Sequence, residues 1–250
     1  MTISLKGLRI LNTRPKGQAQ ALNKEIIEAG GVPVECPALE IISSQKNWIA
    51  QLPDLSAINQ AIFVSPNAVR YSLSKLVAKG IHWPTSIRVI AIGKGTAKAL
   101  TEFHIPVNDV PELPNSEHLI TLDSLQEIKN QQILLVKGED GRKLIEEYLL
   151  SKDTKLHSLT VYKRIIPMIN KEFINSLWRN DLVDIILLTS EHSLRNLFKM
   201  FSKEGQIWLQ NKPCLVISDR LAKTASLFGI KKILVSHPDR MINTLFDYKD

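Results

Sequence analysis

The chain has 250 residues, of which 44% are hydrophobic and 23% are charged. These proportions are ordinary for a globular protein and exclude a disordered, collagen-like or coiled-coil chain. The 32 lysines and arginines outnumber the 25 aspartates and glutamates, and the net charge of +7 favours an anionic partner. The length predicts one large domain or two small ones.

Cysteine usage and the lack of long apolar runs indicate the compartment. Cys36 and Cys214 cannot form a disulfide framework or a zinc site, and we expect both to be buried thiols in a reduced, cytoplasmic protein. No apolar stretch reaches the roughly 20 residues of a membrane-spanning helix, and the first residues contain no apolar signal core. The six histidines show no metal-ligand spacing, so we expect no metal site.

Short apolar runs alternate with helical patterns along the chain. Strands are expected at residues 8–12, 61–64, 88–92, 133–136, 185–188 and 214–217. The helices that follow them are expected at residues 18–29, 67–79, 96–103, 143–150, 193–201 and 221–228. Repeated strand-then-helix units predict parallel sheets with helices on both faces. The strands are almost continuously apolar, as in sheets that are covered on both sides.

These units also repeat within the chain. RILNTR at residues 9–14 resembles QILLVK at residues 132–137. AIFVSPNAV resembles IILLTSEHSL, and VIAIGKGTAKAL resembles CLVISDRLAKTA, with similar offsets along the chain. Two copies of a three-unit half are the simplest account, so the repeat predicts two similar α/β lobes.

Small, hydroxyl-bearing or basic residues follow most of the predicted strands. Ligands of open α/β sheets bind at this edge, and the free N–H groups and partial positive charge of helix N-termini attract anions. Several helix N-termini at one edge of a sheet could together bind an anion that carries many carboxylates or phosphates. The alternative is that each residue only caps its helix. The segments that follow the predicted strands are residues 13–14, 65–67, 93–96, 137–138, 189–190 and 218–220.

Three further features have two interpretations each. Gly93, Lys94 and Gly95 begin a dinucleotide fingerprint, but Lys98 stands where its third glycine belongs. Residues 138–142 form either an anion nest or a tight turn. Tyr162, in the strand-like segment SLTVYKR, either packs or acts as a hydrogen-bonding acid in a dry cleft. Basic residues are interspersed with acidic ones, which gives little support for nucleic-acid binding.

Taken together and in order, the motifs resemble the uroporphyrinogen-III synthase family over residues 8–246. They are ILNTRPKGQAQAL, IFVSPNAV, AIGKGTAKAL, LLVKGEDGRKLIEEYL, LTVYKR, LLTSEHSLRNL and VISDRLAKTASLFGIK. The resemblance implies two α/β lobes joined by a two-stranded linker, with the active site in the cleft between them. It places residues 1–37 and 167–250 in a discontinuous first lobe and residues 38–166 in the second.

The resemblance also implies a function in tetrapyrrole (haem) biosynthesis. The family is a cyclising lyase without a cofactor. It converts hydroxymethylbilane, a linear tetrapyrrole polycarboxylate, into uroporphyrinogen III. Water is lost and ring D is inverted through azafulvene and spiro intermediates. Tyr162 matches the family's functionally important tyrosine and would help the hydroxyl to leave. The residues expected to hold the substrate are Arg14, Ser65, Thr96, Lys137, Gly138, Arg142, Thr189, Ser190 and Arg220.

Two other function classes stay open at this point. One is a two-lobed nucleotide-sugar transferase, and the other is a cytosolic module that binds an anionic ligand without turnover. The chain has Leu221 where some family members have a threonine, so no role is assigned there. We expect a cytoplasmic monomer that binds neither nucleic acid nor membrane. Transient contact with the enzyme that makes hydroxymethylbilane would protect an unstable substrate.

Overall fold

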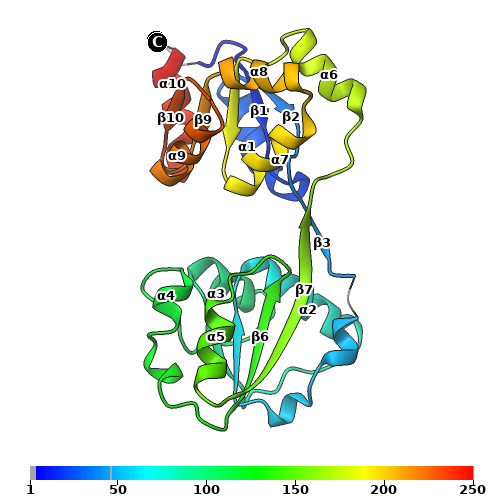
Figure 1. Cartoon of the computed structure of the whole chain (residues 1–250), viewed down its shortest axis with the longest axis vertical. Coiled ribbons are helices and arrows are strands. Elements are labelled where there is room, and N and C mark those ends of the chain that lie inside the picture. Colours follow the sequence, from blue (N-terminus) through cyan, green and yellow to red (C-terminus); the bar gives the residue numbers. More distant parts are fainter. Residues whose placement is uncertain (1–3, 46, 250) are drawn as a thin grey trace. The chain divides into compact units, whose positions relative to one another are not determined.

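The computed structural model describes residues 4–45 and 47–249 and divides the chain into two compact units (Figure 1). Unit 1 comprises Met1–Glu40 and Ile165–Asp250, and unit 2 comprises Ile41–Arg164. The chain passes from one unit to the other within strands β3 (Glu40–Ser43) and β7 (Lys155–Ile165). Each unit has its own five-stranded sheet.

Unit 1 has the strand order β10-β9-β8-β1-β2, with every neighbouring pair parallel. Its elements are β1 (Arg9–Asn12), α1 (Lys16–Glu28), β2 (Val32–Glu35), α6 (Lys171–Arg179), β8 (Ile185–Leu188), α7 (Glu191–Met200), α8 (Lys203–Asn211), β9 (Cys214–Val216), α9 (Asp219–Leu227), β10 (Ile233–Val235), the short 3₁₀ helix η4 (Pro238–Arg240) and α10 (Met241–Lys249). Pro33 lies in β2, where the missing N–H is tolerated because the strand is at the sheet edge.

Unit 2 has the strand order β3-β7-β6-β4-β5. Besides β3 and β7, its elements are η1 (Trp48–Gln51), η2 (Leu55–Ala57), β4 (Gln60–Phe63), α2 (Pro66–Ala78), β5 (Arg88–Ala91), α3 (Lys94–Thr101), α4 (Ser116–Leu119), η3 (Asp123–Leu125), β6 (Gln132–Gly138) and α5 (Leu144–Ser151). The β7-β6, β6-β4 and β4-β5 pairs are parallel. Helix α3 starts two residues before the predicted position because Gly93 is its N-cap.

The two sheets share one topology, as the internal repeat predicts. The order β7-β6-β4-β5 in unit 2 corresponds to β2-β1-β8-β9 in unit 1. The three repeated motifs fall on the equivalent pairs β1 and β6, β4 and β8, and β5 and β9. The predicted fold class, parallel sheets flanked by helices, is therefore confirmed.

Both faces of each sheet are covered by helices, which explains the apolar strands. In β6, Leu134 and Val136 pack with α2 and α3, whereas Ile133 and Leu135 pack with α4 and α5. Strand β8 alternates in the same way between a core with α6, α7, α8 and α9 and a core with α1 and α10. Side chains alternate across a strand, so a strand covered on both faces has no polar position in its interior.

The two cysteines are buried in unit 1, as the sequence predicts. Cys36 and Cys214 are free thiols with no exposed surface. Burial disfavours the thiolate and raises the pKa of each to about 12. Because the thiolate is the reactive form, neither side chain has the character of a nucleophile.

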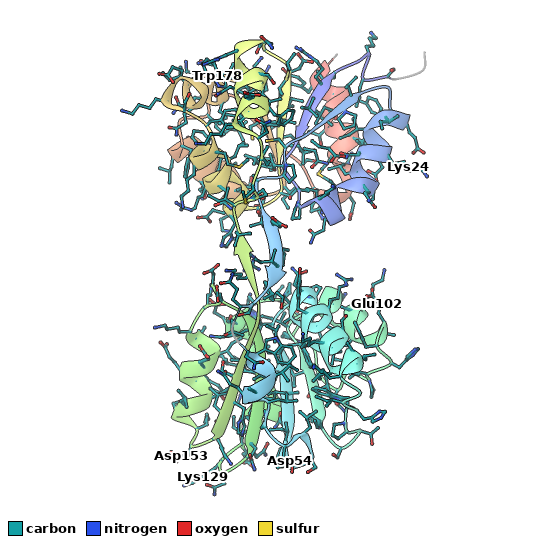
Figure 2. The ribbon with its side chains drawn as sticks, turned by 90° about the vertical axis from the view of Figure 1, so that its right-hand side faces the viewer. Lys24, Asp54, Glu102, Lys129, Asp153 and Trp178 are labelled. Atoms are coloured by element: carbon teal, nitrogen blue, oxygen red, sulfur yellow. The ribbon has the colours of Figure 1, made fainter. Side chains whose placement is uncertain are left out.

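The amino ends of two unit 2 strands carry an exposed ion pair. Lys129 and Asp153, which precede β6 and β7, lie side by side in Figure 2, with Nζ 3.8 Å from Oδ2. Both side chains are about three-quarters exposed, so the pair contributes little to stability. Among the residues that the structure describes, no helix is long and apolar enough to cross a membrane.

Candidate functional site

The carboxyl ends of three neighbouring strands in unit 2 bring Tyr162, Gly138 and Ser65 together. Tyr162 is on β7, Gly138 ends β6 and Ser65 follows β4, and these strands are adjacent in the sheet. The Tyr162 hydroxyl lies 3.1 Å from the Ser65 hydroxyl. The two side chains therefore meet across the central strand, above a residue that has no side chain.

A bulge between β6 and β7 aims Tyr162 at this point. Lys137 pairs with Thr160, but the next residue, Gly138, pairs with Tyr162, so Val161 is an extra residue in β7. Bulges of this kind re-aim side chains near functional sites. The amide of Glu139 donates to the Tyr162 carbonyl at 3.0 Å and holds the shifted register.

Gly138 is required by the tyrosine ring. A Cβ atom at this position would lie 2.6 Å from Cζ and 2.9 Å from the hydroxyl oxygen of Tyr162. Such distances are far shorter than van der Waals contact, so only glycine fits while the ring keeps its place. The sequence singles out Gly138 as a substrate-binding residue. That role stays a prediction, and the structure adds this steric reason for the glycine.

Tyr162 is held on several sides and opens onto one small cavity. The residue is 2% exposed, and its ring stacks on Tyr71 with centroids 6.0 Å apart. Arg164 donates from Nη2 to the hydroxyl at 3.1 Å. The cavity, of about 200 Å³, is also lined by Lys137, Gly138 and Arg142. A ligand that contacts the phenol within unit 2 would occupy this cavity.

The two cations that the sequence predicts at this cavity already form ion pairs with carboxylates. Lys137 lies with Nζ 2.6 Å from Glu146 Oε2, and its side chain is 13% exposed. The exposed Arg142 pairs with Glu117 at 2.6 Å. Each cation already has a carboxylate, so binding a substrate carboxylate would require its ion pair to open. Arg164, which the sequence analysis does not select, forms no ion pair with any described residue.

Glu146 is stabilised as a carboxylate despite partial burial. Burial raises the pKa of Glu146, but the hydrogen bonds from Lys137 and Ser158 outweigh this effect, and the net pKa is below its ordinary value. A carboxyl with a lowered native pKa contributes stability above the pKa of the unfolded state, about 4.3, and loses it as the pH falls through the native value.

Glu146→Gln is therefore expected to lower the free energy of unfolding at neutral pH. The deficit relative to wild type should shrink as the pH falls below about 4.3, because the unfolded wild-type chain then binds a proton at Glu146 that the native carboxyl, with its lower pKa, does not yet bind. Urea unfolding at a series of pH values measures this change. Glu147→Gln, at the exposed neighbouring position, is the control without the ion pair. A deficit that is independent of pH would contradict the assignment.

A second cavity adjoins the first. Its volume is about 510 Å³, within the usual range for ligand pockets, and its lining includes Ser65, Lys94 and Thr96. Both cavities are lined by Val64 and Ile92, so they are neighbours. Thr96 is 2% exposed, and its hydroxyl makes no hydrogen bond to the described residues. The cavity thus places a hydroxyl and a lysine beside the start of α3.

Arg14, Thr189, Ser190 and Arg220 are the predicted site residues that belong to unit 1. Arg14, Thr189 and Ser190 lie just beyond strands at the carboxyl edge of the sheet, and Arg220 is in the first turn of α9, which follows β9. Ser190 caps α7 by accepting from the Ser193 amide at 3.1 Å, which is the simpler of the two roles considered. A site that combines these residues with those of unit 2 stays a prediction.

A polar network that starts at the buried Asn12 and ends at the exposed Glu35 holds the backbone of Arg14, and the sequence does not predict it. Asn12 donates from Nδ2 to Asn23 at 2.6 Å, and Asn23 donates to Glu35 at 2.7 Å. The Asn12 Oδ1 accepts from the Arg14 amide at 3.1 Å. The network fixes the turn after β1, and its only sequence signal is an asparagine at the end of an apolar strand.

Ser65 combines two roles that substitution can separate. Its hydroxyl caps α2 by accepting from the Ala68 amide at 3.0 Å and also contacts Tyr162. Ser65→Ala should reduce the free energy of unfolding by about 1 kcal/mol through the lost cap and should also lower turnover severalfold. Ser202→Ala removes the equivalent cap of α8 and should cost stability alone. Equal turnover in the two variants would show that the contact with Tyr162 is unimportant.

The chain is similar to members of a known family. Residues 20–243 match the sequence model of the family described as uroporphyrinogen-III synthase HemD. The chain is 30% identical over 183 residues to the uroporphyrinogen-III synthase of Proteus mirabilis, covering 72% of this chain and 92% of that protein. It is 28% identical to the Salmonella typhimurium uroporphyrinogen-III synthase, covering 92% and 95% of the two chains.

Solved structures share the fold. A mutant uroporphyrinogen III synthase from Thermus thermophilus superposes with a TM-score of 0.66 at 17% identity, covering 97% of this chain and 98% of that chain. Uroporphyrinogen-III synthetase from Helicobacter pylori gives 0.61 at 14% identity, with the same coverage. The family model that matches residues 20–243 is thus that of the family that the ordered motifs suggest. The chain belongs to the uroporphyrinogen-III synthase family.

Proposed function

We propose that the chain cyclises hydroxymethylbilane to uroporphyrinogen III with loss of one water. The observation that carries the proposal is the Tyr162 hydroxyl, which faces a cavity at the carboxyl edge of the sheet between Ser65 and Arg164. A phenol in a water-poor cavity can protonate a leaving group. Membership of the synthase family supports this reaction over the nucleotide-sugar transferase and the binding module.

In the proposed first step, the bond between the ring A methylene carbon and its hydroxyl oxygen breaks. The electron pair of that bond leaves with the oxygen, which takes the proton of Tyr162 and departs as water. The electrons of the ring A pyrrole fill the vacancy at the methylene carbon. The pyrrole N–H proton passes to solvent to give the azafulvene, and solvent returns a proton to the Tyr162 phenolate. The substituted carbon of ring D then attacks to form the spiro intermediate, whose fragmentation and recombination invert ring D.

Positioning accounts for the rest of the catalysis. The azafulvene can also close without inversion, so the enzyme must hold ring D with its substituted carbon in the reacting position. Contacts between the protein and the substrate carboxylates would hold ring D in this position. In unit 2 we propose Lys94 and Thr96 as their partners, since neither has a competing carboxylate among the described residues. Opening of their ion pairs would add Lys137 and Arg142.

Residues of unit 1 would complete the site if the two units close over the substrate. Arg14, Thr189, Ser190 and Arg220 are the proposed contributors, at the equivalent edge of the second sheet. Only β3 and β7 carry the chain between the units, and such connections permit hinge motion. We further propose that the protein acts as a cytoplasmic monomer and meets the enzyme that makes hydroxymethylbilane only transiently.

Consumption of the substrate tests the proposal. Hydroxymethylbilane is generated in situ and its disappearance is followed with and without the purified chain. We expect a rate above that of spontaneous closure, proportional to the concentration of the chain. A rate equal to the spontaneous one, with the protein folded, would refute the enzymatic function and leave the binding module as the better explanation. Thermal-shift measurements with nucleotide sugars test the transferase, and a stabilising nucleotide would favour it.

A further inference from the structure

Arg164 contacts Tyr162 in two ways. Its Nη2 lies 3.1 Å from the phenol oxygen, and its Cζ lies 5.3 Å from the ring centroid. One residue, Lys163, separates them along β7, so they project from the same side of the strand. We propose that Arg164 is a positioning residue, which orients the Tyr162 hydroxyl so that its proton points into the cavity. This inference rests on the proposed function.

The proposal follows from what each group can donate. A guanidinium has only donors, so the phenol oxygen must accept from Arg164. Ser65 accepts from the Ala68 amide, and either hydroxyl of the Ser65–Tyr162 pair, 3.1 Å apart, can be the donor; in the orientation that we propose, Ser65 donates to the phenol oxygen. In that orientation both lone pairs of the phenol oxygen are engaged, and the phenol proton points away from Ser65 and Arg164. The proton is then available to a leaving hydroxyl in the cavity.

The surroundings of Arg164 suit this role better than a structural one. Its side chain is half-buried and lines the same cavity as the phenol. Other arginines in unit 2 have carboxylate partners: Arg70 pairs with Glu102, Arg88 with Asp109 and Arg142 with Glu117. Arg164 has no ion pair with a described carboxylate, so its positive charge stays beside the phenol. A cation there also stabilises the phenolate that forms when the proton leaves.

The hydrogen bond is tested first without any substrate. Tyrosine is labelled with ¹³C at Cζ, and the Tyr162 resonance is assigned by its absence in Tyr162→Phe. Arg164→Met is expected to move this resonance while the resonances of Tyr148 and Tyr248 keep their positions. An unmoved Tyr162 resonance in a folded Arg164→Met protein would overturn the proposal. This readout is independent of turnover, so it does not depend on the proposed function.

Kinetics then test whether the hydrogen bond from Arg164 affects turnover through the Tyr162 hydroxyl. Arg164→Met should lower kcat about tenfold with little change in KM, the size expected for a charge-assisted hydrogen bond. In a Tyr162→Phe background the same change should have almost no further effect, because the ring remains but the hydroxyl is gone. Arg164→Lys keeps a cationic donor and should restore part of kcat. Should Arg164→Met fail to fold, Arg164→Lys and Arg164→Gln provide the comparison.

Two kinetic results would overturn the proposal. An equal loss of kcat in both backgrounds would show that Arg164 does not act through the hydroxyl. A raised KM with unchanged kcat would show that it only binds substrate. Arg179→Met is the matched control, since Arg179 lies over the Trp178 ring of unit 1 at 5.2 Å and should leave both constants unchanged. Absence of turnover in the wild-type chain would refute the proposed function instead, and the resonance shift would still stand.

Discussion

Replacement of Tyr162 by phenylalanine is expected to lower kcat by about 10²-fold, at the low end of the range for a lost general acid. The ring, its stacking on Tyr71 and its place above Gly138 are kept, whereas the hydroxyl that faces the cavity is removed. Stability should fall by only about 1 kcal/mol, since the variant loses hydrogen bonds to Ser65 and Arg164 but leaves no cavity in the core. Steady-state kinetics and urea unfolding measure the two effects.

A second tyrosine supplies the control for this substitution. Tyr148 on α5 donates its hydroxyl to the Leu125 carbonyl at 3.0 Å and takes no part in the candidate site. Tyr148→Phe should therefore match Tyr162→Phe in stability while keeping wild-type turnover. Wild-type turnover in Tyr162→Phe would exclude the phenol as the proton donor, and the positioning of ring D alone would have to account for catalysis.

Gly138→Ala should abolish most turnover by displacing Tyr162. The new Cβ would lie 2.6 Å from Cζ of a ring that is itself 2% exposed and packed on Tyr71, so the ring or the strand must move. Overpacking of this kind costs about 1–3 kcal/mol of stability. The displaced hydroxyl loses its contacts with Ser65 and Arg164, and we expect a fall in kcat at least as large as that of Tyr162→Phe.

A substitution at Gly141, in the same turn, shows whether the effect of Gly138→Ala is steric. A Cβ there would meet its nearest atoms at 3.6 and 3.7 Å, which is ordinary contact, and the backbone φ is not in the left-handed region. Gly141→Ala should therefore unfold at nearly the wild-type denaturant concentration. A Gly138→Ala protein as stable and active as wild type would mean that the tyrosine ring moves freely, contrary to its close packing.

The fold is largely predictable from the sequence because its inner strands are covered on both faces. Strands β1, β4, β6 and β8 are apolar runs followed directly by helices, and this pattern predicts them. The strands β2 and β10 are edge strands, one with Pro33 in its centre and one of three residues, so neither has the pattern. Helices α6, α8 and α10 do not directly follow a strand of the repeat, and their sequence signals are amphipathic faces and, for α6 and α8, the capping residues Asn170 and Ser202.

The site is only partly predictable because its geometry depends on one bulge. Ser65, Gly138 and Tyr162 are each identifiable as strand-end residues or family matches, but their meeting point requires the register shift at Gly138. The role of Arg164 is indicated only by its spacing of two residues from Tyr162. The ion pairs of Lys137 and Arg142 bring together residues distant in sequence, so no local pattern shows that these cations are already paired.

The identity of the cyclic product shows whether the chain inverts ring D. Hydroxymethylbilane generated in situ is incubated with the chain, the products are oxidised, and the uroporphyrin isomers are separated by chromatography. If the chain steers ring D, isomer III should dominate in proportion to the enzyme added, against isomer I from spontaneous closure. Isomer I alone, from a folded protein, would contradict the account, because ring D would then close without inversion.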